Sequence, residues 1–267
     1  MKYQLKILSG VFGLAMIGQV SAATNWTLTG TPTTGVSVSA YANTNGTSTT
    51  NNAALQTIEA ATWVASYGGI TNADKPNSGR SDIDLNEGSS TLPYPEHAID
   101  NNQRYDMALL TFTDSVKLTQ LSLGYTYNDS DVTVMAYTGA GAPTLIGKTF
   151  DALVGWTLIG NYSNVGSGTS INSSGIFSSY WLIGAYNPLA ANGSGVAGRT
   201  TSMVGGAAGD SNYDYVKLSS VTGCISGTTG CNPPSTGSKV PEPGSLALLG
   251  VGVVGLMRMR KSRRARD

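Results

Sequence analysis

Two stretches of the sequence gather oxygen-bearing side chains that could bind a cation. Asn128-Asp129-Ser130-Asp131 offers carboxylates in a turn, and Asp82-Ile83-Asp84 with Glu87 forms a second acidic cluster. Calcium takes about six to eight oxygen ligands, often from such loops. Neither stretch has the full Asp-x-Asp-x-Asp-Gly…Glu spacing, and Asp and Asn are also common in turns without a metal. We expect no cofactor, with calcium at Asp129 and Asp131 as the open alternative.

The sequence offers few residues from which a catalytic site could be formed. His97 is the single histidine of the chain, and Asp100 and Asp106 lie near it. Serine is plentiful, but no Gly-x-Ser-x-Gly motif of a nucleophile elbow occurs. A glycosidase needs two carboxylates at a set separation, and the only Glu residues outside the C-terminal tail are Glu59, Glu87 and Glu96. We therefore expect no enzyme and interpret His97 as a loop residue that orients the turn into the segment at Tyr105.

The two cysteines, Cys224 and Cys231, enclose the short segment Ile-Ser-Gly-Thr-Thr-Gly. In an oxidising compartment, such a pair predicts a disulfide. Metal binding is disfavoured because the chain has one histidine.

Aromatic side chains on the surface would favour a carbohydrate-binding module. Trp156 and Trp181 lie inside apolar runs, which favours core packing for both. The candidate rings are Trp63, Tyr67, Trp156, Tyr162, Tyr180 and Trp181.

The segments that must position these residues have the sequence pattern of β-strands. Short apolar alternations are bounded by Gly, Asn, Asp or Pro, with no heptads and no long helical periodicity. We predict an all-β fold, an antiparallel β-sandwich of jelly-roll type, with a generic antiparallel sandwich as the alternative. The leucine spacing predicts a bulge near Thr119-Gln120. The predicted strands are Val36–Ala42, Tyr105–Phe112, Val116–Tyr127, Asp131–Tyr137, Gly155–Asn161, Ser179–Ala185 and Asp214–Val221.

Three segments depart from this pattern. Asn51–Ser66 has apolar residues at both helical and strand spacings, so helix and strand stay open. Asp74–Tyr94 and Asn187–Gly209 read as long surface loops, the first polar and the second rich in Gly and Ala.

The N-terminus has the layout of a secretory signal peptide. Lys2 and Lys6 precede the apolar stretch Ile7–Ile17, and small residues follow up to Ala23. We expect cleavage near Ala22 or Ala23, so that the mature protein begins at Ala23 or Thr24.

The C-terminus combines three features in a fixed order. Val240-Pro241-Glu242-Pro243 is followed by the uncharged stretch Gly244–Met257, which is short against a hydrocarbon core of about 30 Å. A basic end follows, and positive charge beside a membrane segment stays in the cytoplasm, so we expect Thr24–Lys239 to lie outside. The basic residues are Arg258, Arg260, Lys261, Arg263, Arg264 and Arg266.

This tail resembles the PEP-CTERM sorting signal of Gram-negative bacteria, with Val240, Pro241, Glu242, Pro243, Arg258, Arg260 and Lys261 as its signal residues. The resemblance implies a temporary membrane anchor, recognised by an exosortase-type membrane protease and cleaved near the Pro-Glu-Pro, and then transfer to the cell surface or the surrounding matrix. A plain single-span anchor is the alternative. Exopolysaccharide is a further candidate partner.

A second resemblance covers residues 97–137, which are similar to a family of exosortase-dependent surface proteins and to the first half of lectin-like jelly rolls. It implies the fold and no activity. Nucleic acid is excluded as a partner by charge, because residues 24–239 carry eight basic and fourteen acidic residues, about −6 net.

These observations divide the chain into four parts: a signal peptide (1–23), a β-sandwich ectodomain (24–232), a linker (233–240) and a sorting tail with a membrane helix (241–267). The predicted function is a structural or adhesive role at the cell surface or in the extracellular matrix. The alternative is a carbohydrate-binding, lectin-like module that depends on calcium.

Overall fold

The computed structural model describes residues 23–31, 33–45, 57–71, 95, 97–102, 104–190 and 213–231. The predicted signal peptide, the loop Asp74–Tyr94, the linker and the sorting tail with its membrane helix lie outside these residues, apart from Ala23. The acidic cluster of Asp82, Asp84 and Glu87 also lies outside them. The division into four parts therefore stays a prediction.

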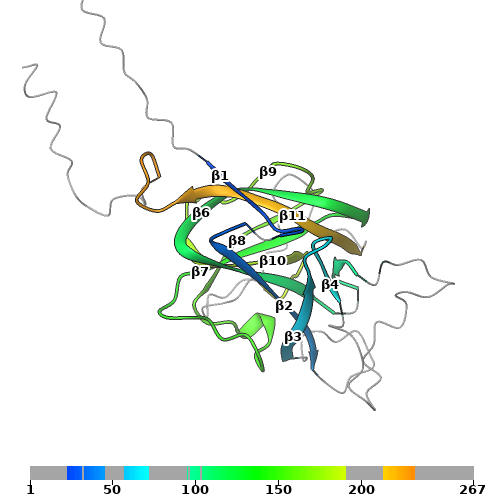
Figure 1. Cartoon of the computed structure of the whole chain (residues 1–267). Coiled ribbons are helices and arrows are strands. Elements are labelled where there is room, and N and C mark those ends of the chain that lie inside the picture. The colour runs from blue at the N-terminus through cyan, green and yellow to red at the C-terminus, as the bar shows by residue number, and fades with distance from the viewer. Residues whose placement is uncertain are drawn as a thin grey trace, which may run out of the picture. The chain divides into compact units, whose positions relative to one another are not determined.

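Strands make up nearly all of the regular structure (Figure 1). One 3-10 turn, η2 (Phe150–Ala152), is the exception within the part of the chain that the structure describes. The strands are β1 (Thr24–Thr27), β2 (Val36–Asn45), β3 (Thr57–Val64), β4 (Gly69–Thr71), β5 (Ile99–Asp100), β6 (Asp106–Asn128), β7 (Val132–Tyr137), β8 (Trp156–Tyr162), β9 (Thr169–Ser170), β10 (Ser178–Ala185) and β11 (Asp214–Ile225).

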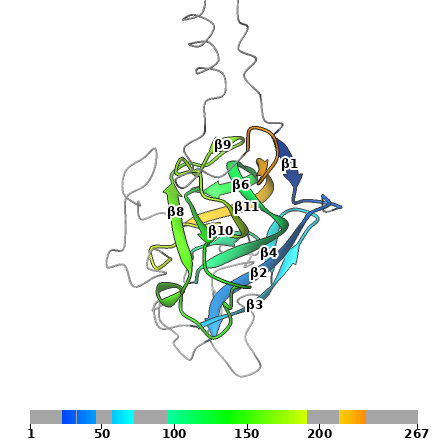
Figure 2. The ribbon, with the colours of Figure 1, turned by 90° about the vertical axis from the view of Figure 1, so that its left-hand side faces the viewer.

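The strands pair antiparallel in the order β4-β3-β2-β6-β10-β7-β8, and β11 pairs with β6, β1 and β5. In the turned view of Figure 2, β2 and β3 lie side by side, away from β8 at the other end of this order. The all-β, antiparallel prediction is confirmed. The sandwich packing and its jelly-roll connectivity stay predictions, since the strands form one sheet.

Strand β6 pairs with two different groups of strands. Its first half pairs with β2 and β10, and its second half pairs with β11, so that β11 lies over the first group of strands (Figure 1). We expected two strands here, separated at Thr113–Ser115. That expectation is wrong, because the backbone N–H of Thr113 donates to Gly35 (3.1 Å) and the carbonyl of Ser115 accepts from Ser226 (2.8 Å). The polar residues mark the point where β6 changes its partner strands, and not the end of a strand.

The predicted bulge lies in the second half of β6. Thr222 is opposite Gln120 and Gly223 is opposite Leu118, which leaves Thr119 as the extra residue. The Thr119 hydroxyl donates to the carbonyl of Thr222 (3.2 Å). The bulge is therefore confirmed.

Two apolar clusters fill the two faces of the central strands. Ala108, Leu110, Trp181 and Ile183 point into the larger cluster, beneath β11. Their neighbours Met107, Leu109 and Leu182 point into the second cluster, which Leu145, Phe150, Leu153 and Leu189 complete. Because both faces are covered, β7 and β10 read as continuous apolar runs and not as strict alternation.

The segment left open between helix and strand forms β3, at least over its described part from Thr57. Of the second predicted loop, Asn187–Ala190 is a turn and the rest lies outside the described residues. No helix among the described residues has the length and apolar character that a membrane crossing requires.

Candidate functional site

An acidic cluster, formed by Asp129, Asp131 and Asp214, is the main concentration of ionisable groups in the described structure. Asp129 and Asp131 lie in the turn between β6 and β7, and Asp214 is the first residue of β11. Asn128 opens the turn with a φ of 61°, a conformation that Asn tolerates better than most residues. Oxygen atoms of the three carboxylates lie within 4.8 Å of one another.

Hydrogen bonds fix the carboxylates from several directions. The backbone N–H of Asp131 donates to Asp214 Oδ1 (2.6 Å), and Asn101 Nδ2 donates to Asp214 Oδ2 (2.6 Å). The N–H of Asn164 donates to Asp131 Oδ1 (2.8 Å), and that of Ser130 donates to Asp129 Oδ1 (2.7 Å). The backbone N–H of Asp214 in turn donates to Asn101 Oδ1 (2.8 Å).

Burial and mutual repulsion raise the pKa of Asp214. The side chain is 2 % exposed and that of Asp131 is 5 % exposed. Burial, with the negative charges of Asp131 and Asp129, raises the pKa of Asp214 to about 8, although hydrogen bonds from Asp131 and Asn101 oppose the shift. The pKa of Tyr186 is raised by burial and by Asp131 and Asp214. Three carboxylates in this space need a proton or a cation to offset their charge, and their oxygens are ligands suited to calcium.

The sequence predicted Asp129 and Asp131 as candidate calcium ligands, and the structure places their carboxylates together. Asp214 was missed. It lies 83 residues after Asp131, and its position at the start of a predicted strand gives no sign of its neighbours. Calcium binding itself stays a prediction.

The disulfide is confirmed. Cys224 at the end of β11 is bonded to Cys231, with 5.9 Å between the Cα atoms. The bridge closes a turn in which the N–H of Cys231 donates to Thr228 (2.9 Å).

None of the contacts that the structure shows for His97 involves the acidic cluster. Its side chain is exposed, and its ring lies 6.0 Å from that of Tyr67. Asp100 is buried and accepts a hydrogen bond from the N–H of Asn102 (2.9 Å). A catalytic role for His97 gains no support from these contacts.

The proposed aromatic set needs correction. Trp156 (1 % exposed), Trp181 (0 %) and Tyr162 (4 %) are buried and cannot meet a ligand at the surface. The core packing predicted for both tryptophans is confirmed. Exposed tyrosines occur instead at Tyr125, Tyr127 and Tyr213, which sequence reasoning missed although Tyr125 and Tyr127 alternate on a predicted strand.

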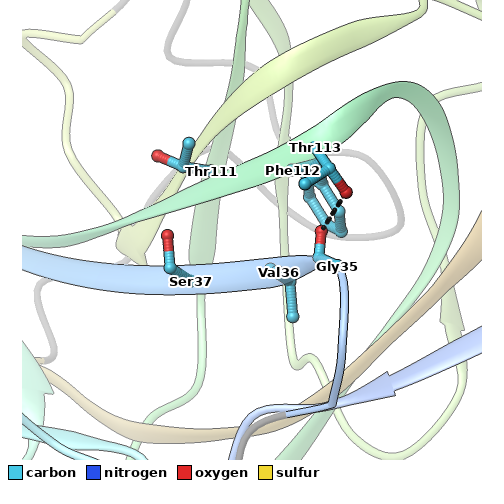
Figure 3. Close-up of a pocket in the computed structure, with 6 residues that line it drawn as sticks. All are labelled: Gly35, Val36, Ser37, Thr111, Phe112 and Thr113. Atoms are coloured by element: carbon cyan, nitrogen blue, oxygen red, sulfur yellow. Dashed lines mark hydrogen bonds between the residues drawn. The ribbon is translucent and has the colours of Figure 1, made fainter.

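A pocket opens between β2 and β6 (Figure 3). Ser37 and Thr111 are cross-strand partners there, as are Val36 and Phe112. The Thr113 hydroxyl donates to the carbonyl of Gly35 (3.3 Å). The six lining residues offer hydroxyl groups and no ionisable group, so this pocket holds no catalytic pair of its own.

Comparison with known families identifies a motif at the C-terminus. Residues 239–264 match the family model described as the PEP-CTERM protein-sorting motif. The chain thus carries the PEP-CTERM motif at its C-terminus, as the sequence predicted, and this motif implies export and exosortase processing. No curated protein and no solved structure matches the chain.

Proposed function

We propose that this is an exported, exosortase-sorted protein with a structural or adhesive role at the cell surface or in the extracellular matrix, and without catalysis. The carrying observation is the PEP-CTERM motif at residues 239–264, which follows an all-β, disulfide-bonded body. Disulfides are typical of exported proteins.

The sequence of the tail supports a sorting signal that is cleaved off, and not a permanent anchor. Four Gly residues in Gly244–Met257 make a poor permanent helix, since each Gly costs about 1 kcal/mol relative to Ala. Pro241 and Pro243 favour extended backbone around Glu242, which suits a protease cleft. The six basic residues hold the end in the cytoplasm.

The test follows the fate of the tail in a bacterium with an active exosortase. Native protein should reach the cell surface without Asp267, whereas Glu242→Ala, or neutral residues in place of the six basic ones, should leave uncleaved protein in the membrane. Mass spectrometry of surface-released protein measures this. Recovery of Asp267 on native surface protein would contradict sorting and favour a plain membrane anchor.

The second candidate is a carbohydrate-binding surface module that depends on calcium. The convergence of Asp214 on Asp129 and Asp131 favours it, because the fold adds a third carboxylate to the two that the sequence predicted.

A further inference from the structure

Lys217 lies between two tyrosine rings on the surface of the β6–β11 pair. Its Nζ is 4.4 Å from the centre of the Tyr67 ring and 4.8 Å from that of Tyr125. Tyr125 is the cross-strand partner of Lys217, and Tyr127 is that of Tyr215. Because residues two apart point to the same side of a strand, Tyr125, Tyr127 and Lys217 share one face. We call these three residues and Tyr67 the tyrosine–lysine platform.

Two glycines allow the turn that carries Tyr67 to lie close to β11. The β3–β4 turn contacts β11, where the N–H of Leu218 donates to the carbonyl of Gly68 (2.8 Å). A Cβ on Gly68 would collide with the Leu218 carbonyl, and one on Gly69 would collide with the carbonyl of His97. The turn can approach so closely only without side chains at both positions. The ring of Tyr67 is thus held over Lys217 by backbone contacts.

The platform is open to solvent, and Lys217 gives it a positive charge. Tyr125 is 38 % exposed and Tyr127 is 37 % exposed. Partial burial lowers the pKa of Lys217, and its ammonium lies against the faces of two tyrosine rings. A cation held by ring faces keeps the capacity to bind an anion. Exposed tyrosines around it supply flat apolar area with hydroxyl groups at the edge.

We propose that the tyrosine–lysine platform binds a carboxylate-bearing saccharide of an extracellular polysaccharide. The ring faces pack against the C–H groups of a sugar, and Lys217 pairs with the carboxylate. A neutral sugar would leave the cation unmatched, so charge complementarity selects the acidic one. The inference deepens the carbohydrate-binding candidate and rests on it, and it does not require the acidic cluster to hold a metal.

The experiment uses the full-length chain in a detergent without a sugar headgroup. The probes are polygalacturonate and its methyl-esterified form, which keeps the backbone and loses the charge. Calorimetry should show binding of polygalacturonate that is at least about tenfold tighter than binding of the ester, the order expected for one charge-assisted contact, and that weakens with salt.

Variants locate the site. Lys217→Gln and, separately, Tyr125→Ala should each weaken polygalacturonate binding by about tenfold or more. Lys117→Gln is the matched control, because Lys117 lies on β6, outside the platform, and its Nζ is likewise near an aromatic ring, 5.6 Å from that of Phe177. This variant should bind as the native chain does. Thermal unfolding confirms that each variant is folded.

Two results would overturn the inference. Equal loss in Lys117→Gln, or no loss in Lys217→Gln and Tyr125→Ala, places binding elsewhere and leaves the carbohydrate-binding candidate standing. Absence of binding to both polymers by folded native protein removes the platform proposal, and the carbohydrate-binding candidate would then rest on the acidic cluster alone. Neither result affects the sorting proposal, which the tail variants test.

Discussion

At the scale of single residues, the protonation of Asp214 is the feature with the clearest measurable effect. Its pKa is about 8 in the folded protein, against an ordinary value of 3.8. Between these values the folded state retains a proton that the unfolded state has released. The folded state is therefore stabilised by this group at low pH, and the contribution is lost as pH rises toward about 8.

We predict that the melting temperature in calcium-free buffer falls between about pH 4 and pH 8, and that Asp214→Asn, which mimics the protonated side chain, shows a smaller fall. Thermal unfolding across this range measures the effect. Asp114→Asn, a change at an exposed residue of β6, is the control and should keep the native slope. An identical slope in Asp214→Asn would contradict the raised pKa.

The same carboxylates predict a response to calcium. Millimolar calcium should raise the melting temperature, because at about 100 times Kd a ligand of the folded state adds about 2.7 kcal/mol. Asp129→Ala and Asp214→Asn should each reduce the rise, while Asp114→Asn should not. Calorimetry gives the binding heat directly. No heat and no change in melting temperature in native protein would remove the calcium site.

The sequence predicts only those residues of this site that lie close together in the chain. Asp129 and Asp131 share one turn, so their spacing alone suggests joint ligation. Asp214 and its partner Asn101 come from distant segments that meet only because β11 pairs with the end of β6. Tertiary pairing of this kind leaves no local pattern.

At the scale of elements, the disulfide at the end of β11 is the most direct test of local stability. Closing so short a loop contributes about 2 to 3 kcal/mol. Reduction should therefore lower the melting temperature by roughly 5 to 10 °C. The double variant Cys224→Ser, Cys231→Ser should melt at the reduced value and be insensitive to reductant. Unchanged melting after confirmed reduction would show that the bridge adds no stability.

The β3–β4 turn gives a second test. Gly68 has a φ of +75° and no room for a Cβ, whereas Gly227 has a φ of +83° with nothing within 4 Å. Gly227→Ala should cost about 1 to 2 kcal/mol from the backbone conformation alone. Gly68→Ala should cost more, because it also displaces the turn from β11.

Chemical denaturation of both variants compares these costs. Gly68→Ala should also weaken polygalacturonate binding through Tyr67, and Gly227→Ala should not. Equal losses of stability would contradict the close contact with Leu218.

The longer strands were predictable because alternation and turn residues lie within a few positions of each other. The four short strands β1, β4, β5 and β9 were not predicted, since two to four residues carry too little pattern and exist by pairing with longer strands. The break predicted at Thr113-Asp114-Ser115 was wrong because residues typical of turns occur there inside a continuous strand.

At the scale of the whole molecule, composition and the terminal segments indicated an exported all-β protein, and the PEP-CTERM motif was recognisable directly. The order of the strands was not, because it depends on β6 exchanging β2 and β10 for β11 halfway along its length. Tyr162, a ring proposed for the surface, is buried for the same reason, because it packs into the cluster between the two halves of β6.

The pairing of β11 with β6 also determines how the protein would respond to mechanical force. The last described strand leads to the tail, and its register with β6 runs from Asp214–Asn128 to Ile225–Val116. In an antiparallel pair the hydrogen bonds lie across the strands, so a pull on the C-terminal end of β11 loads them in shear. Many bonds must then fail together instead of opening one after another. A precursor that is still held by its uncleaved tail would therefore resist a pull along β11 better than a force that peels the strand from its edge.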